Sequence, residues 1–253
     1  MRLRQVALVA KDLEPHVVTL KTVLGLNVAY RDPGVGVFGL VNAVFPVGGE
    51  FLEIVQPVKD NASAARYLKR RGGDAGYMVI LQADDAIAHR ARVLALGARK
   101  IWEHDSAEYQ FTHFHPGDFT GVLTSIDSVP GKSWTERDGL WPPAGKDWRL
   151  HRSDADVVGL SAVTIQARNR SAVARRWAEL LDAPLDVGTN ELRLGRGAIR
   201  FVDPIDEDGS GVVAIEVAHK HPDAALARAK ANALTVRGNS FQLCGIAFKL
   251  IPA

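Results

Sequence analysis

The sequence predicts an α+β fold built from four β-α-β-β-β modules that pair into two domains. The first observation is internal repetition: the alternating, β-branched segment LRQVALVAKD at 3–12 recurs in looser form three more times. The second is that each copy precedes a stretch with apolar residues at helical spacing. The third is that short extended segments, separated by Gly and Pro turn signals, follow the helices. One repeated unit therefore accounts for most of the chain.

The first module begins with a strand at Leu3–Ala10. Asp12 is the expected N-cap of the following helix, and Pro15 lies in its first turn, where a missing N–H costs least. The helix carries an apolar stripe and is expected to stop at Gly25. Three short strands complete the module, at Asn27–Arg31, Val37–Phe45 and Glu50–Gln56.

The second module repeats this order of elements. Its first strand is Tyr77–Leu81, and Asp84 or Asp85 is expected to cap a helix that ends at Gly97. A short helix around Ala64–Arg70 is expected between the two modules. Three strands follow the capped helix, at Arg99–Glu103, Tyr109–Phe114 and Gly121–Ile126.

The third and fourth modules are shortened relatives of the first two. In the third, the strand Leu160–Ala167 precedes a helix capped by Ser171. Short strands are expected near Leu185, near Leu192 and at Ile199–Val202. The fourth has a strand at Val212–Val217, a helix from Asp223 and a final strand at Gly245–Leu250. Its helix, HPDAALARAKANALTVR, resembles DDAIAHRARVLALGAR of the second module, which supports the repeat.

The module pairs predict a domain at residues 1–127, a connector at 128–156 and a shorter domain at 157–253. The connector is rich in Pro and Gly but also contains Trp134, Trp141 and Trp148. A disordered linker would be poor in aromatic residues, so we expect this segment to pack across a surface and brace the two halves. The alternative is that the tryptophans wall a pocket.

Composition limits the classes of function. An apolar content of 47%, a charged content of 24% and a net charge of +2 are typical of a soluble globular protein and give no electrostatic argument for nucleic acid. The basic run 69–71 reads as a solvated helix end, with a phosphate contact as the alternative. Cys244 is the single cysteine, so an intrachain disulfide is impossible and a buried thiol is expected. Without an apolar stretch long enough for a membrane span, or a signal-peptide pattern, we expect a cytoplasmic protein with no membrane partner.

The modules resemble the vicinal oxygen chelate superfamily of glyoxalase, bleomycin-resistance and extradiol-dioxygenase proteins. The most specific matching segments are Gln5–Asp12, Phe51–Pro57 and His115–Asp118, the last leading into Gly121–Leu123. The resemblance covers nearly all of the chain outside the tryptophan segment. It implies that two modules pair their curled sheets around a divalent metal, whose ligands come from the first and last strand of each module.

The resemblance also implies where the metal ligands should stand. In the first two modules the four positions are Gln5, Glu53, Met78 and Ser125, and a thioether and a hydroxyl do not replace an imidazole and a carboxylate. In the last two modules they are Ala162, Arg200, Val213 and Lys249, which would repel a cation. We therefore expect no metal or other cofactor, although His113 and His115 could form a three-ligand site with Glu53 or His104. The competing interpretation is a hydrogen-bonded or exposed histidine pair.

Glu53 and Tyr109 are the candidate catalytic residues. Glu53 stands among apolar neighbours, so burial would raise its pKa and suit it to acid–base work, and Tyr109 could donate to an oxyanion. Glu53 could equally bind a ligand without catalysis or serve structure alone. The candidate ligand-binding residues are mostly apolar with a few polar groups: Gln5, Ala7, Met78, Ile80, His113, Leu123 and Ser125.

Two functions follow from these candidates. The first is a glyoxalase-like small-molecule-binding protein with a degraded metal site and a pocket in the N-terminal domain, similar to bleomycin-resistance proteins. The second is a glyoxalase or dioxygenase-type lyase or isomerase that acts on a small oxygenated metabolite, with Glu53 as base or metal ligand. A homodimer is possible in either case. Fold alone does not choose between these functions.

Overall fold

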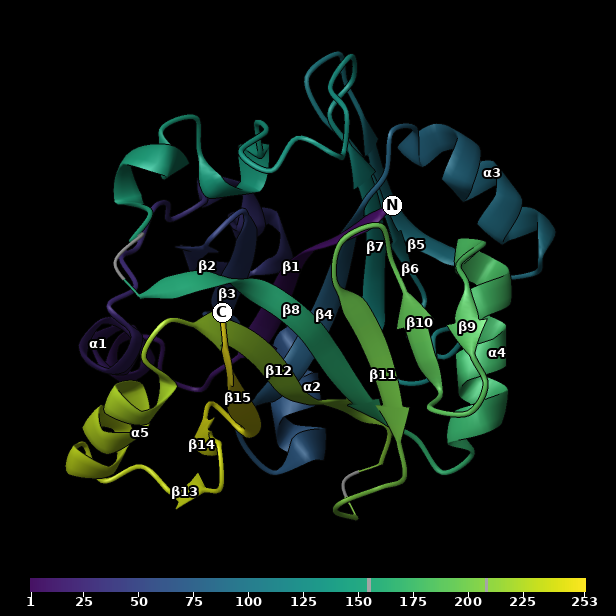
Figure 1. The fold of residues 1–253 in the computed structure, drawn as a ribbon. Coiled ribbons are helices and arrows are strands. Elements are labelled where there is room, and N and C mark those ends of the chain that lie inside the picture. The colour runs from purple at the N-terminus through teal and green to yellow at the C-terminus, as the bar shows by residue number, and fades with distance from the viewer. Residues whose placement is uncertain (154–155, 208) are drawn as a thin grey trace. The chain divides into compact units, whose positions relative to one another are not determined.

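The computed structural model describes residues 1–153, 156–207 and 209–253 of the chain (Figure 1). Its strands belong to two mixed sheets, one of seven strands (β1 to β7) and one of eight (β8 to β15), so the predicted α+β class is confirmed. By their contacts the residues group into two compact units, which are described separately below. Unit 1 comprises Met1–Gln5, Tyr77–Leu140 and Ala162–Val212, and unit 2 comprises Val6–Gly76, Trp141–Ser161 and Val213–Ala253.

The helices are short, and the strands range from two to ten residues. The helices are α1 (Glu14–Leu24), α2 (Ser63–Arg71), α3 (Ala86–Ala95), α4 (Arg170–Leu181) and α5 (Pro222–Ala231), with 3-10 turns η1 (Pro33–Phe38), η2 (Pro142–Ala144) and η3 (Trp148–His151). The strands of the first two modules are β1 (Arg2–Val9), β2 (Leu40–Val47), β3 (Glu50–Pro57), β4 (Ala75–Gln82), β5 (Lys100–Asp105), β6 (Gln110–Phe114) and β7 (Leu123–Ser128). The remaining strands are β8 (Val157–Gln166), β9 (Leu185–Asp186), β10 (Glu191–Arg193), β11 (Ala198–Val202), β12 (Gly211–His219), β13 (Val236–Arg237), β14 (Ser240–Leu243) and β15 (Ile246–Pro252).

The predicted repeat is visible in how each module pairs its own strands. In the second, third and fourth modules the first strand lies parallel to the last, as β4 with β7, β8 with β11, and β12 with β15. Parallel pairing requires a crossover connection, and the module's helix lies within that connection. The other strands of each of these modules are joined antiparallel. These three modules therefore share one construction, as the sequence repeat predicts.

The first module departs from the prediction by one strand. Residues 27–31 form no strand, and only one isolated bridge joins Tyr30 to Val44 of β2. The 3-10 turn η1 follows, because Pro33 fixes its backbone angle and the Asp32 side chain accepts a hydrogen bond from the N–H of Gly34 at 2.8 Å. This module is therefore β-α-β-β, with β2 and β3 as its antiparallel pair.

Helix caps agree with the sequence in one case and differ in two. Asp85 caps α3 by accepting a hydrogen bond from the N–H of Ala88 at 2.8 Å, as predicted. Asn169 rather than Ser171 caps α4, because the chain enters the helix two residues earlier than predicted. The residue before α1 is Leu13, which makes no side-chain cap; Asp12, one position earlier, accepts a hydrogen bond from the N–H of Glu14 at 3.4 Å, so the predicted capping contact forms one residue upstream.

Unit 1 contains the strand sets β4-β7-β6-β5 and β8-β11-β10-β9, apart from the first residues of β4 and the first half of β8, which belong to unit 2. It also contains the helices α3 and α4, which lie side by side in Figure 1. A chain of aromatic rings fills its interior. Phe119 contacts Phe114 at 5.6 Å and Trp177 at 5.0 Å between ring centroids, and Trp177 contacts Phe201 at 5.6 Å. All four rings are buried, so strands of two modules and helix α4 share one apolar core.

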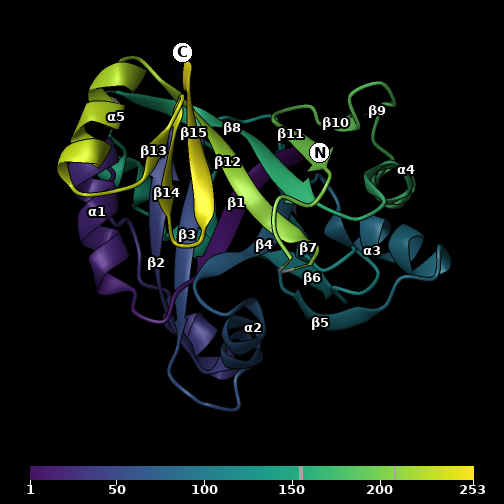
Figure 2. The same cartoon turned by 90° about the horizontal axis from the view of Figure 1, so that it is seen from below.

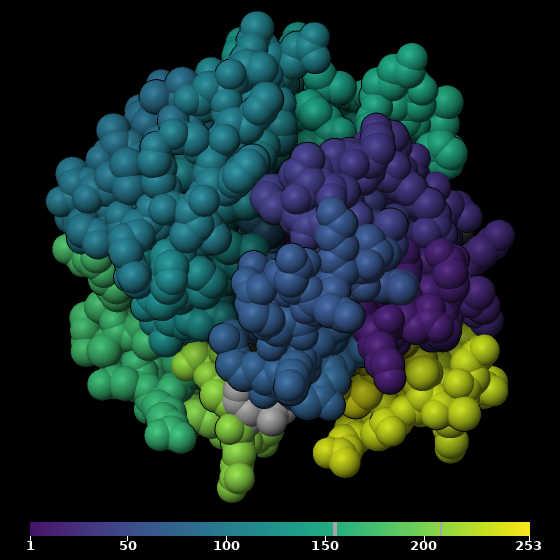
Figure 3. Space-filling view, turned by 180° about the vertical axis from the view of Figure 1, so that it is seen from behind, coloured from purple at the N-terminus to yellow at the C-terminus, as the bar shows by residue number. Residues whose placement is uncertain are grey.

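Unit 2 contains β2 and β3, the set β13-β14-β15-β12, and the helices α1, α2 and α5. Helices α1 and α5 lie against each other in both Figure 1 and Figure 2. From behind, the surface of this unit shows its purple and blue N-terminal segments together with its yellow C-terminal segment (Figure 3). The basic run forms the end of α2, as predicted, and is closed by Gly72 in the left-handed region; Lys69 and Arg70 are exposed and Arg71 is half-buried.

The tryptophans of the connector are packed. Within unit 2, Trp141 and Trp148 are fully buried and contact the Phe51 ring of β3 at centroid distances of 6.3 and 4.9 Å. Within unit 1, Trp134 lies so close to Gly195 that a Cβ there would meet its ring at 2.1 Å. The expected packing role is confirmed for Trp141 and Trp148, while residues 154 and 155 of the connector lie outside the described residues.

The domain boundaries at 127 and 157 stay predictions. Each compact unit combines two modules, but unit 1 takes the second and third modules and unit 2 takes the first and fourth. Across the described residues, the helices are all too short or too polar to cross a lipid bilayer.

Candidate functional site

One face of the β4-β7-β6-β5 strands in unit 1 gathers the chemically useful side chains. Strand register places Ile80 of β4 beside Ser125 of β7, and Ser125 beside His113 of β6. The next row places Asp127 of β7 beside Phe111 of β6. Because side chains alternate between the faces of a strand, these rows lie on the same face. We call this surface the aromatic face and define it by Met78, Ile80, Tyr109, Phe111, His113, Leu123, Ser125 and Asp127.

Asp127 is the most strongly perturbed acid of this face. Its carboxyl accepts hydrogen bonds from the hydroxyl groups of Tyr109 and Ser125, one on each oxygen. The residue is 2% exposed, and burial raises its pKa to about 7 even though the two hydrogen bonds act in the opposite direction. Near neutral pH this carboxyl therefore exists in both protonation states, which is the condition for proton transfer.

A row of rings borders the carboxyl. The ring of Phe111 lies 4.8 Å from that of His113, 5.4 Å from that of Tyr109 and 5.7 Å from that of His104. Burial disfavours the imidazolium form of His113 and lowers its pKa to about 4. At neutral pH its ring is uncharged, with one nitrogen able to donate and one to accept a hydrogen bond. Since Tyr109, Phe111 and His113 are only partly buried, the row retains surface that a flat molecule could contact.

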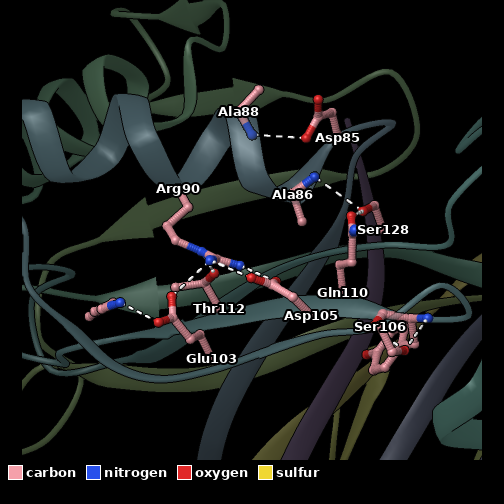
Figure 4. Close-up of polar contacts among 12 residues, drawn as sticks. Asp85, Ala86, Ala88, Arg90, Glu103, Asp105, Ser106, Gln110, Thr112 and Ser128 are labelled. Carbon is pink, nitrogen blue, oxygen red and sulfur yellow. Dashed lines mark hydrogen bonds and ion pairs between the residues drawn. The ribbon is translucent and has the colours of Figure 1, made fainter.

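The opposite face of the same strands is closed by helix α3 (Figure 4). Arg90 of α3 donates to the Thr112 hydroxyl at 2.7 Å and pairs with the carboxylates of Asp105 and Glu103. Those hydrogen bonds and charges raise the pKa of Arg90. A second contact holds the start of α3, where the N–H of Ala86 donates to the Ser128 hydroxyl at 3.1 Å. This face is structural, so chemistry on these strands belongs to the aromatic face.

Glu53, the sequence candidate for acid–base work, lies in unit 2. It is buried on β3 at 7% exposure, and its carboxylate accepts a hydrogen bond from the Asn42 side-chain amide at 2.6 Å. The other end of that amide accepts from the N–H of Asp32 at 2.7 Å. Asn42 therefore orients Glu53 and is itself oriented by the turn that replaces the missing strand. The burial is as predicted, and the catalytic role stays a prediction.

The predicted site residues divide between the units. Glu53 and the buried Ala7 belong to unit 2. Gln5, which is 1% exposed, and six others belong to unit 1, namely Met78, Ile80, Tyr109, His113, Leu123 and Ser125. Of these, the structure brings together Ile80, Ser125 and His113 in one row, with Tyr109 joined to Ser125 through Asp127.

Tyr109 was expected to face a substrate oxyanion. Its hydroxyl instead donates to the carboxyl of Asp127. Its role on this face is therefore to hold that carboxyl, and donation to a substrate would require the Asp127 bond to break.

Six of the eight positions that the resemblance assigns to metal ligands hold residues that do not fit a divalent ion, the exceptions being Gln5 and Glu53. The Ser125 hydroxyl lies fully buried within hydrogen-bond distance of Asp127 and of the Thr112 carbonyl, and Met78 offers only a thioether. In the third module Arg200 donates to Glu191 at 2.7 Å, and in the fourth Lys249 lies 3.5 Å from Glu216. These cations neutralise acids of their own units and leave no anionic ligand set.

The histidines considered as replacements are used differently. His115 accepts hydrogen bonds at Nδ1 from the N–H of Gly117 and from Arg99, each at 3.0 Å, so it serves the turn, which was the competing interpretation. His104 stacks on Phe111. Within residues 1–153, 156–207 and 209–253, no three donors that include His104, His113 or Glu53 come within ligating distance of one another.

Asp127 is the site residue that sequence reasoning missed. It stands two positions after Ser125, and strand alternation places both side chains on one face. That signal was available, but the strand was expected to end at Ile126, one residue before the carboxyl. The structure continues β7 to Ser128 and so includes it.

Comparison with known proteins supports the fold assignment. Residues 6–181 match the sequence profile described as a glyoxalase-like domain. A substituted 4-hydroxymandelate synthase from Streptomyces coelicolor superposes over 92% of this chain and 75% of its own, with 18% identity and a TM-score of 0.69. A methylmalonyl-CoA epimerase from the same organism, in complex with 2-nitronate-propionyl-CoA, is 20% identical over 51% of this chain and 97% of its own, with a TM-score of 0.47.

The curated proteins contain no sequence that matches this one. The profile match nevertheless spans more than half of the 253 residues, and the modules reproduce the strand and helix order expected for the fold. The chain therefore belongs to the glyoxalase-like domain family.

Proposed function

We propose that this protein binds a small, planar and largely apolar molecule on the aromatic face of unit 1. The observation that carries the proposal is the partly exposed row of Tyr109, Phe111 and His113 beside the buried carboxyl of Asp127. Ring stacking would supply affinity, at about 0.5–1.5 kcal/mol for each aromatic contact beyond the area buried. The neutral imidazole of His113 would supply one directional hydrogen bond.

The proposed site no longer uses the family's metal. Its ancestral positions in unit 1 hold Met78 and Ser125, and Ser125 now supports Asp127. A thioether and a neutral hydroxyl are poor ligands for Zn²⁺, Fe²⁺ or Mn²⁺. Binding would therefore rest on stacking, apolar contact and hydrogen bonds, as is usual in small-molecule pockets.

A second function is favoured by one specific observation, the pKa of Asp127 near 7. An acid poised at neutral pH could accept a proton from an activated carbon or oxygen of the bound molecule and return it elsewhere. That reaction would make the protein an isomerase or lyase on the same face. Glu53 of unit 2 is the alternative base for such a reaction, as inferred from the sequence.

Binding can be tested with a panel of planar aromatic carboxylates, phenols and amides, monitored by ligand-observed NMR. We expect at least one class to bind, and Phe111→Ala to weaken that affinity about tenfold, equivalent to about 1.4 kcal/mol. His151→Gln is the matched control, because His151 is exposed in η3 of unit 2. Absence of binding across the panel, or equal affinity in Phe111→Ala, contradicts the proposal.

The catalytic alternative can be separated from binding with Asp127→Asn. If the protein is an isomerase, a bound compound with an acidic C–H should exchange that hydrogen with D₂O in the wild type, and the variant should slow the exchange at least a hundredfold. Equal exchange rates in both proteins would mean that a residue other than Asp127 is the base. Glu53→Gln would then be the informative variant. Absence of exchange with every bound compound supports the pure binding function.

A further inference from the structure

A cluster of three potential metal ligands lies in unit 2, outside the aromatic face. His16 is in the first turn of α1, Asp74 directly precedes β4, and Cys244 is in the turn between β14 and β15. One donor atom of each lies within 4.8 Å of the other two. Within the described part of the chain this is the one group of three such side chains at ligating distance. An imidazole, a carboxylate and a thiol are the protein ligands that Zn²⁺ uses.

The chain makes this cluster through an unusual turn. Cys244 has a φ of 50°, in the left-handed region that residues with a side chain rarely adopt. Gly245 follows at φ 74°, and a Cβ there would lie 1.8 Å from the Asp74 carbonyl oxygen. Only glycine permits this approach, so the β14–β15 turn is held against the backbone of Asp74. Strain of this kind is found preferentially at functional sites.

The carboxylate of the cluster is already oriented. Asp74 accepts a hydrogen bond at Oδ1 from the N–H of Lys11 at 2.8 Å, while Oδ2 lies 2.7 Å from Nε2 of His16. One oxygen is thus held by the backbone and the other is directed at the imidazole. A carboxylate ligand fixed by a hydrogen bond from outside the ligand set is a regular feature of metal centres.

Access to the cluster is one-sided. The side chains of His16 and Asp74 are 16% and 27% exposed, whereas Cys244 is 4% exposed and its thiol contacts the Val9 carbonyl at 3.6 Å. An ion could enter from the His16 and Asp74 side and meet the sulfur at the bottom. Water could then complete its coordination from the solvent side.

We propose that His16, Asp74 and Cys244 bind a divalent cation of borderline softness, for which Zn²⁺ is the best match, with solvent as the fourth ligand. The His16–Asp74 hydrogen bond opens, the Cys244 thiol releases its proton to solvent, and sulfur, nitrogen and oxygen each form one bond to the ion. Carboxylate and thiolate together carry two negative charges, which the ion neutralises. No electron is transferred, so the step needs no oxidant or reductant.

The required movement is small. Donor atoms on a tetrahedral Zn²⁺ lie about 3.4 Å apart, given bond lengths of about 2.0–2.3 Å. The cluster's limit of 4.8 Å therefore closes by rotation of the partly exposed side chains of His16 and Asp74. The alternative use of the same residues, as a nucleophile with its base, is disfavoured because burial and the Asp74 charge raise the pKa of the Cys244 thiol.

Cobalt provides a direct test, because Co²⁺ occupies Zn²⁺ sites and its thiolate bond gives a charge-transfer band in the near ultraviolet. Metal-free wild-type protein is titrated with Co²⁺ and then with Zn²⁺. We expect the band to appear at a stoichiometry near one and to disappear as Zn²⁺ displaces the cobalt. Cys244 is the chain's single cysteine, so a thiolate band can come from no other residue.

Three variants and one control complete the test. Cys244→Ser should lose the band, while Asp74→Asn and His16→Ala should weaken Co²⁺ binding at least tenfold. His16→Ala keeps the test valid if the strained turn does not tolerate serine, because His16 lies on a partly exposed helix surface. His151→Gln, an exposed histidine of the same unit, should bind cobalt like the wild type.

Absence of the band in the wild type, or an unchanged affinity in both His16→Ala and Asp74→Asn, overturns the proposal. The test is independent of the aromatic face, because none of its residues belongs to unit 1. Metal retained in Glu53→Gln but lost in Cys244→Ser would place the ion here rather than at the family's ancestral position. Metal lost in Glu53→Gln and retained in Cys244→Ser would contradict both proposals.

Discussion

Asp127 of unit 1 and Asp74 of unit 2 are the same residue type with opposite pKa shifts. Asp127 is buried, its partners are the neutral hydroxyls of Tyr109 and Ser125, and its pKa rises to about 7. Asp74 is also penalised by burial, but hydrogen bonds from His16 and from the Lys11 N–H, together with their positive charges, outweigh that effect and lower its pKa.

The difference shows that the charge state of a carboxyl depends on the chemistry of its hydrogen-bond partners as well as on how deeply the carboxyl is buried. Two hydroxyl donors do not compensate the loss of water around Asp127. At Asp74 a backbone N–H and an imidazole that can carry charge do compensate for the lost water, and 27% of the side chain also remains exposed. A neutral acid suits proton transfer or ligand binding, whereas an ionised carboxylate suits a cation. The two functional proposals follow this division.

The largest change in the free energy of unfolding should come from replacing the ionisable side chain of Asp127. Its pKa is higher in the folded than in the unfolded chain, so the folded state holds an extra proton between pH 3.8 and about 7, and the free energy of unfolding falls as pH rises through this window. The shift corresponds to about 4 kcal/mol. Asp127→Asn should therefore gain stability relative to the wild type by about that amount between pH 4 and pH 8, measured by urea unfolding.

A constant difference between the two proteins across that range would mean that Asp127 is ionised in the folded state. The comparison with Asp74 would then fail, because both carboxylates would carry their charge at neutral pH.

His113 should produce the next largest effect, with the opposite sign. Its pKa falls from 6.5 to about 4 on folding, so the unfolded chain binds the extra proton and stability is lost as pH falls through this window. The shift corresponds to about 3 kcal/mol. In His113→Gln the acid sensitivity between pH 6.5 and 4 should decrease by this amount, and NMR titration of the wild-type imidazole reports the pKa directly. A titration midpoint above 6 would show that solvent or an unseen acid stabilises the imidazolium.

The smallest change in the free energy of unfolding should come from replacing Asp74. Its pKa is lower in the folded state, so its contribution is present above the unfolded value of 3.8 and is lost as pH falls through the folded value. Because both partners are partly exposed, we expect Asp74→Asn to cost about 1 kcal/mol at pH 7 in metal-free protein. The cost should shrink at pH 2, because the Asp74 carboxyl takes up a proton and loses its charge as pH falls through its folded pKa. A loss that is the same at both values of pH would indicate packing rather than charge.

The repeat predicted most of the elements because local sequence carries their signals. Asp85 caps α3 and Gly25 ends α1 in the left-handed conformation, as their positions indicate. The error at residues 27–31 has a local cause, because an extended stretch needs a partner to become a strand and this one has only the Tyr30–Val44 bridge. Asn169 was missed as a cap because the neighbouring Ser171 offered an equally plausible one.

The candidate site was harder to predict than the fold. The sequence placed Ser125 and His113 among the candidate ligand-binding residues, but it did not identify Asp127 as the acid between the hydroxyls of Tyr109 and Ser125. The cluster of His16, Asp74 and Cys244 had no sequence signal, because 58 residues separate the first two and the third lies in the fourth module. Ligand spacing is informative only where the ligands share one element.

The sequence alone determined the repeated module, the Asp85 cap of α3 and the Gly25 end of α1, since each depends on residue identity and short-range spacing. Only the tertiary structure decided the charge states of Asp127 and Asp74 and the meeting of Cys244 with His16. The pKa of each acid depends on its burial and on partners such as Tyr109 for Asp127 and His16 for Asp74, which lie 18 and 58 residues away in the chain.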